Sequence, residues 1–107
     1  MKKILIPLAL LSGLAHAEFN DGNKLLSDLR ESGYVVPSVA LGYIMGVADV
    51  VRGTQWCPPE NVTAGQIRDM VRNYLEAYPN IRHYTGDAIV IRVLSVNWPC
   101  AKKGSTL

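Results

Sequence analysis

Apolar residues recur at intervals of three and four along most of the chain after residue 20. The clearest case is the segment 63–78, where apolar residues occupy positions 67, 70, 71, 74, 75 and 78 without a break. This spacing is typical of an amphipathic helix. Thr63 is predicted to cap its N-terminus, and Gln66 completes a capping box by reaching back to Thr63. Pro79 then ends the helix.

Shorter patterns predict a helix at each end of this region. The first begins at Asn20 or Asp21, carries three leucines on one face and ends before Gly33. The last spans residues 86–97 behind a Thr85 cap. Its β-branched residues would also suit a strand, but no second strand exists to pair with it. Together with the helix described next, the patterns predict an all-α fold, a compact bundle of about four helices.

The remaining helix is predicted over residues 38–52 and is apolar almost all round. Such a helix belongs either at the centre of a bundle or at a subunit contact. Gly42 and Gly46 each cost up to about 1 kcal/mol in helix propensity, so we expect another backbone to approach them closely. In so apolar a helix Asp49 must either be paired or face water, and we expect a salt bridge. Its candidate partners are Arg52, Arg82 and Arg92. We assign both glycines and the aspartate to the framework.

The N-terminus has the pattern of a secretory signal peptide. Two lysines precede an apolar run over residues 4–14, and the small-x-small triplet Ala15-His16-Ala17 follows. A retained anchor helix is the alternative, but the run is too short to span a bilayer. We therefore expect a signal peptide at residues 1–17, a single mature domain at 18–107, and export to the periplasm.

Charge excludes two classes of partner for this mature domain. Removing the two signal lysines from 11 Lys+Arg leaves 9, against 9 Asp+Glu, so the net charge is zero. A nucleic-acid-binding protein would carry a basic excess. A protein that binds membrane surfaces would carry a basic amphipathic helix. We expect neither nucleic acid nor membrane among the partners.

Two cysteines remain after the signal peptide, Cys57 and Cys100. In an oxidising compartment we expect them to form one disulfide, worth roughly 4 kcal/mol from loop closure. The rival interpretation makes Cys57 a nucleophile with His83 as its base, but neither cysteine has the flanking glycines of a nucleophile turn. Two cysteines and one histidine also lack metal-ligand spacing. We therefore predict no enzyme activity, no metal and no cofactor.

Several motifs resemble those of the Rap/Tai family of immunity proteins. They are Gly-Tyr-Ile-Met-Gly-Val-Ala-Asp at 42–49, Cys-Pro-Pro-Glu-Asn-Val-Thr-Ala-Gly-Gln at 57–66, Tyr-Leu at 74–75, Pro79, Arg-His at 82–83 and Trp-Pro-Cys at 98–100. Their order and spacing cover nearly the whole mature chain. One departure is that Leu29 and Ala40 stand where many relatives carry a further cysteine pair.

The resemblance implies a small, all-helical periplasmic protein, often a homodimer, that protects bacteria from peptidoglycan amidase toxins delivered by type VI secretion. A binding protein needs a preorganised contact, and the loop at 53–62 has two prolines and a disulfide to fix it. Trp56 is either a lid over the core or an exposed anchor. The expected partner-binding residues are Trp56, Pro58, Pro59 and Glu60, with Arg82 and His83 as a nearby second patch.

Two further functions stay open at this point. One is a periplasmic acid-stress chaperone, which would unfold partly and bind clients near pH 3. The other is a structural or phage-borne binding module without a toxin partner. An exported hydrolase comes last, because the chain offers no paired acids, phosphate loop or triad.

Overall fold

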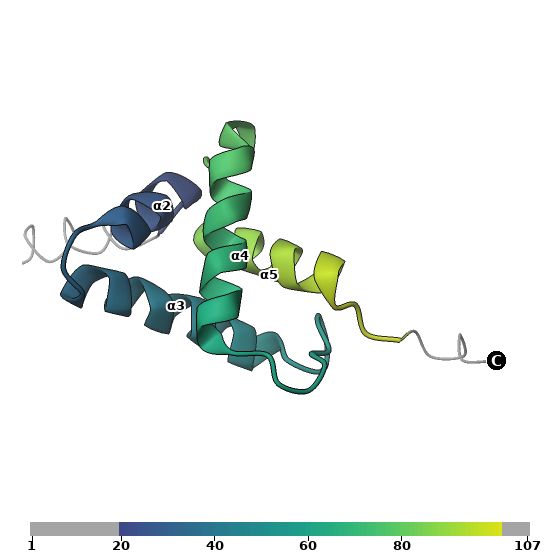
Figure 1. Cartoon of the computed structure of the whole chain (residues 1–107). Coiled ribbons are helices and arrows are strands. Elements are labelled where there is room, and N and C mark those ends of the chain that lie inside the picture. Colours follow the sequence, from purple (N-terminus) through teal and green to yellow (C-terminus); the bar gives the residue numbers. More distant parts are fainter. Residues whose placement is uncertain (1–19, 102–107) are drawn as a thin grey trace, which may run out of the picture.

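The computed structural model describes residues 20–101, which form four α-helices and one short 3-10 turn and contain no strand (Figure 1). The elements are α2 (Gly22–Arg30), α3 (Val35–Val51), α4 (Ala64–Ala77), η2 (Pro79–Ile81) and α5 (Gly86–Asn97). The predicted all-α class, the four helices and the closing disulfide are confirmed. The predicted signal peptide at 1–17 lies outside the described residues. No helix among residues 20–101 is long and apolar enough to cross a membrane.

Side-chain caps explain where α2 and α4 begin. The Asp21 carboxylate accepts a hydrogen bond from the backbone N–H of Lys24 at 2.9 Å, and the Thr63 hydroxyl accepts one from the N–H of Gln66 at 3.1 Å. The return bond from the Gln66 side chain is not formed, because that side chain is exposed to water. Thr85 occupies the N-cap of α5 but makes no side-chain bond there.

Helix α3 begins at Val35, three residues before the predicted start at 38. We expected Val35 and Val36 to be a connector and Pro37 to open the helix. Pro37 instead lies inside the first turn, where its missing N–H needs no partner. The connection from α2 is correspondingly short, and Gly33 makes the turn with a φ of +79°.

The four helices each contact the other three and enclose one core. Its fully buried side chains come from every helix: Leu25, Ile44, Ile67, Val71, Leu75, Val90 and Leu94. Leu29 and Ala40, the two positions at which the sequence departs from the pattern it resembles, are 6% and 4% exposed and belong to the same apolar cluster. Both positions are therefore filled by apolar packing.

Close backbone approach occurs at Gly22 and Gly86. A Cβ on Gly22 would lie 2.7 Å from Ile89 Cδ1, and one on Gly86 would lie 2.9 Å from the Tyr43 hydroxyl. At Gly42 and Gly46 an added Cβ would meet nothing within 4 Å, so the expectation of a close approach there is wrong within this chain.

Backbone hydrogen bonds hold the start of α2 against the segment between η2 and α5. The N–H of Gly22 donates to the Tyr84 carbonyl at 3.0 Å, and the N–H of Gly86 donates to the Asn20 carbonyl at 2.7 Å. Because these bonds bring two backbones together, both glycine positions lack room for a side chain.

Candidate protein-binding site

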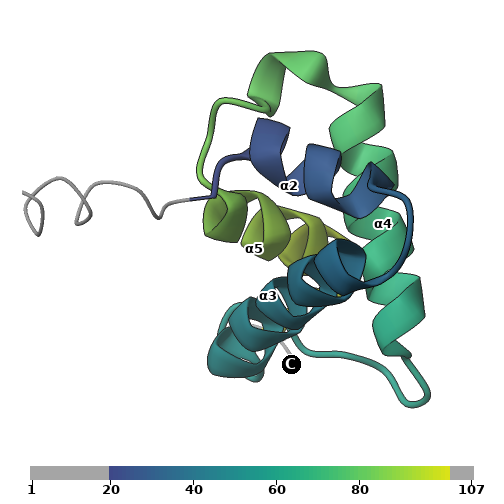
Figure 2. The ribbon, with the colours of Figure 1, turned by 90° about the vertical axis from the view of Figure 1, so that its left-hand side faces the viewer.

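The α3–α4 loop, residues 52–63, projects from the lower end of α4 (Figure 2). A disulfide joins Cys57 in this loop to Cys100 after α5, with their Cα atoms 4.8 Å apart, as predicted. The backbone N–H of Cys57 also donates to the Trp98 carbonyl at 2.9 Å. One covalent bond and one hydrogen bond therefore fix the base of the loop to the end of α5.

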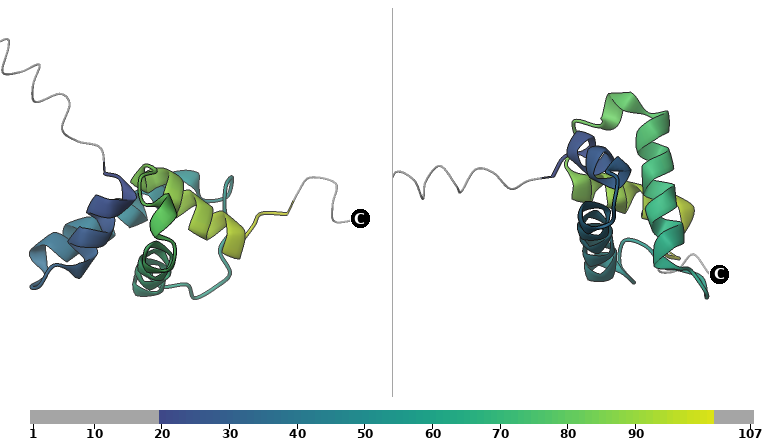
Figure 3. Two further views of the ribbon diagram at one scale, coloured as in Figure 1. Left: turned by 90° about the horizontal axis from the view of Figure 1, so that it is seen from above. Right: turned by 60° about the vertical axis from the view of Figure 1, so that its left-hand side comes forward.

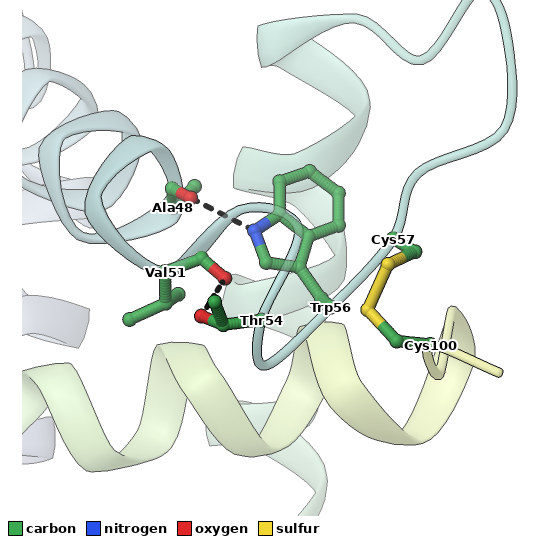
Figure 4. Close-up of a disulfide and its surroundings, with 6 residues drawn as sticks. All are labelled: Ala48, Val51, Thr54, Trp56, Cys57 and Cys100. Carbon is green, nitrogen blue, oxygen red and sulfur yellow. Dashed lines mark hydrogen bonds between the residues drawn. A yellow bond between two sulfur atoms is a disulfide. The ribbon is translucent and has the colours of Figure 1, made fainter. Parts of the chain in front are cut away.

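The first residues of the loop form a tight turn at the end of α3. Gly53 adopts a φ of +84°, and its N–H donates to the Trp56 carbonyl at 2.7 Å. The Thr54 hydroxyl donates to the Val51 carbonyl at 2.9 Å (Figure 4). This turn satisfies carbonyls at the end of α3 and reverses the chain toward the core.

The Trp56 indole fills the space below the loop. It is 3% exposed, and its Nε1–H donates to the Ala48 carbonyl of α3 at 2.8 Å (Figure 4). Its ring lies 5.9 Å from that of Trp98. Of the two interpretations offered by the sequence, the lid over the core is confirmed. Trp56 supports the loop from beneath and does not present an aromatic surface to solvent.

The outer part of the loop carries Pro58, Pro59, Glu60 and Asn61. Pro59 and Glu60 are exposed, and Pro58 is partly buried. Asn61 has a φ of +70°, a left-handed conformation that asparagine tolerates better than most residues. Glu60 forms no ion pair with any other described residue. The tip is therefore a proline-stiffened turn with one unbalanced negative charge.

Arg82 and His83 lie beyond the opposite end of α4, so the structure does not bring them near the loop (Figure 3, right). The Arg82 Nε–H donates to the Leu75 carbonyl at 2.7 Å, which caps the C-terminus of α4. A cation at this end of a helix is favourable. His83 is exposed, with its ring 4.3 Å from that of Tyr84.

The outer face of α3 is a second exposed surface. Val35, Val39 and Val50 are 72%, 69% and 83% exposed, and Gly42 and Gly46 lie exposed between them. The three-to-four spacing of these positions was visible in the sequence, but spacing alone does not say whether a face is inside. Only one side of α3 is buried, so this outer valine face is open in the single chain.

Asp49 belongs to the exposed side of α3, and the expected salt bridge is wrong. No ion pair joins it to Arg52, Arg82 or Arg92 in the described structure. The prediction assumed that an apolar helix buries all its residues. Because this side of α3 faces water, Asp49 is solvated and needs no partner.

The described residues offer little for catalysis. Both cysteines are consumed by the disulfide, so Cys57 presents no thiolate and cannot act with His83. Burial raises the pKa of the Tyr43 hydroxyl, and the negative charge of Asp87 adds to that rise. Residues 20–101 contain no group of three or more His, Cys, Asp or Glu that could hold a metal ion. The described residues are therefore suited to binding another molecule through shape and charge.

Comparison with known protein families matches the chain to the model described as Rap1a immunity proteins, over residues 21–100. The matched segment runs from the N-cap of α2 to the second disulfide cysteine, and so covers the whole described bundle. No curated protein matches the chain.

Proposed function

Because the chain belongs to the Rap1a immunity protein family, which is non-enzymatic, we propose that it binds and inhibits a peptidoglycan amidase toxin delivered by type VI secretion. An immunity protein acts by binding a cognate toxin. The amidase target and the route of delivery come from the resemblance of the sequence motifs to the Rap/Tai proteins. The geometry of the α3–α4 loop supplies the structural argument.

The observation that carries this proposal is a projecting loop that is fixed at its base before any partner arrives. Ordering a loop on binding costs affinity, and a preformed loop avoids that cost. Here the Cys57–Cys100 bond, the buried Trp56 and the two prolines all restrict the loop. A narrow rigid projection suits a concave enzyme cleft better than a flat surface.

We assign the direct contacts to Pro58, Pro59 and Glu60. The Glu60 carboxylate is exposed and unpaired at the tip, so it favours a cleft that presents a cation or hydrogen-bond donors. Trp56 acts by supporting the loop. Arg82 and His83 form a separate contact at the far end of α4, where Arg82 holds the backbone that carries the exposed His83 ring.

The periplasm is the proposed location. A disulfide persists in that oxidising compartment and not in a reducing cytosol. The signal-like pattern at residues 1–17 supplies the route of export. The amidase substrate, peptidoglycan, lies in the same compartment.

We also propose that two copies pair through the outer valine face of α3. Contiguous exposed apolar patches mark protein contacts. Gly42 and Gly46 have open space above them, which lets a second helix come close to the backbone. The valine face and the projecting loop involve different residues, so pairing leaves the loop tips free.

The test expresses the protein with an amidase encoded beside its gene, with the amidase directed to the periplasm, and follows cell lysis. The wild-type chain should prevent lysis. Glu60→Lys should weaken protection, because it reverses the charge at the tip. Glu31→Lys makes the same charge change at an exposed C-cap of α2, outside the loop, and should protect fully.

Two outcomes would contradict the proposal in different ways. Lysis with every neighbouring amidase would remove the amidase as the target. Full protection by Glu60→Lys, and by a variant with Pro58 and Pro59 both changed to Gly, would move the contact away from the loop.

A further inference from the structure

A groove outside the loop and the valine face lies between α4, η2 and α5, where α4 crosses α5 (Figure 1). Its volume is about 400 Å³. The lining residues are Tyr74, Ile81, Tyr84, Ala88, Ile89 and Arg92. A space of this size accommodates one or two side chains of a partner rather than a folded surface.

Aliphatic and aromatic side chains line the groove. Ile89 is 3% exposed and Ile81 is partly buried, whereas Tyr84 is 53% exposed. Tyr74 packs against Tyr78, with ring centroids 5.0 Å apart. The groove thus combines buried aliphatic surface with two aromatic side chains.

The lining of the groove also carries one charged side chain. Arg92 is the only charged residue in the lining, and its side chain is exposed. The ion pairs among the described residues involve other cations, namely Lys24, Arg30, Arg68 and Arg72. The hydroxyls of Tyr74 and Tyr84 likewise form no hydrogen bond with another described residue. The groove therefore presents an unbalanced positive charge and two unused hydroxyl groups beside apolar surface.

We propose that this groove binds an acidic peptide segment of a partner protein. An aromatic or aliphatic side chain of the segment packs on Ile81 and Ile89, between the two tyrosines. A neighbouring carboxylate pairs with the Arg92 guanidinium, whose planar donors match a carboxylate in a two-bond arrangement. Buried apolar contact supplies affinity, and the charge selects acidic over neutral or basic segments.

The consequence is a second docking site on an immunity protein. No residue of the α3–α4 loop lines the groove, and none of the exposed valines of α3 does. A partner held in the groove leaves the loop available for the toxin. It lies beside the second contact at Arg82 and His83, because Ile81 and Tyr84 flank these two residues.

The test uses three blocked tetrapeptides that differ at one position: acetyl-Gly-Phe-Glu-Gly-amide, and the same peptide with Gln or Lys in place of Glu. Each is titrated into the oxidised, isotope-labelled protein while backbone amide shifts are recorded. The Glu peptide should produce saturable shifts within residues 81–92. The Gln peptide should bind about fivefold more weakly, as the loss of one exposed ion pair implies.

Two variants and one control identify the site. Arg92→Gln should weaken the Glu peptide about fivefold and abolish its preference over the Gln peptide. Arg68→Gln removes a partly exposed arginine of α4 outside the groove and should change nothing. Ala88→Leu fills the groove from an exposed helical position and should block binding even if Arg92→Gln fails to fold.

Equal binding of all three peptides, shifts confined to the loop or to α3, or the absence of saturable shifts would each overturn the proposal. None of these measurements uses the toxin. A failed peptide titration therefore leaves protection through the loop intact, and a failed lysis assay leaves the groove intact.

Discussion

Alanine substitutions at four glycines should distinguish two effects on the free energy of unfolding. One is a steric clash where the glycine lies against another segment, and the other is a gain in helix propensity where it lies open. Gly22 and Gly86 stand at backbone junctions, where an added Cβ would lie 2.7 Å from Ile89 Cδ1 and 2.9 Å from the Tyr43 hydroxyl. Gly42 and Gly46 stand on the open side of α3 with nothing within 4 Å. The same change of one methyl group should therefore act in opposite directions at the two pairs.

The structure also sets the magnitudes. At Gly22 the Cβ would meet the Arg82 backbone as well, at 2.8 and 2.9 Å, so the neighbours cannot simply rotate away. Overpacking of this kind costs about 1–3 kcal/mol, and we expect the upper half of that range. At Gly42 and Gly46, alanine gains about 0.5–1 kcal/mol because glycine is a poor residue in a helix interior.

Urea denaturation of the oxidised protein, followed by circular dichroism at low protein concentration, measures both effects. Gly22→Ala and Gly86→Ala should unfold at lower urea, and Gly42→Ala and Gly46→Ala at higher urea, with unchanged slopes. A Gly22→Ala variant as stable as wild type would refute the backbone junction. A strongly destabilised Gly42→Ala monomer would show that α3 is enclosed, as the sequence first indicated.

Three more predictions concern the bridge, the dimer and pH. Changing Cys57 and Cys100 together to Ser should lower the free energy of unfolding by about 4 kcal/mol. A reductant should destabilise the wild type to the same extent and leave the variant unchanged. A loss under about 1 kcal/mol would contradict the loop-closure account. Val50→Asp, at a position 83% exposed, should abolish pairing in analytical ultracentrifugation without lowering monomer stability, whereas a variant that still sediments as a dimer would move the interface. The raised pKa of Tyr43 means that the folded state holds the hydroxyl proton more tightly than the unfolded state. This contribution to the free energy of unfolding is complete below pH 10 and is lost as pH rises through the native pKa. Unfolding midpoints of wild type and Tyr43→Phe should therefore diverge as pH rises above about 10, and parallel curves would exclude this coupling.

The parts of the fold that follow from the sequence are those fixed by local chemistry. The sequence predicts helix α4 closely because a cap residue precedes it, an unbroken apolar repeat runs along it and a proline follows shortly after its end. The Cys57–Cys100 bond was predictable because two cysteines allow a single pairing. Such features need no knowledge of the other helices.

The wrong predictions concern features that depend on how the helices pack against one another. The composition of α3 indicates an apolar helix but does not say how many sides are covered, and this ambiguity misplaced Asp49 and both of its glycines. The groove was missed for a related reason. Tyr84, Ala88 and Arg92 have the spacing of one helical face, but Tyr74, the α4 residue in the lining, lies ten residues before Tyr84.

The disulfide between Cys57 and Cys100 also sets the order of steps by which a newly made molecule matures. With export to the periplasm as proposed, the second cysteine reaches that compartment only after the whole segment that forms α4 and α5 has been translocated. The disulfide then forms only once an oxidant acts. A cell starved of thiol oxidase would therefore hold copies without the disulfide, and its newest molecules would protect it least.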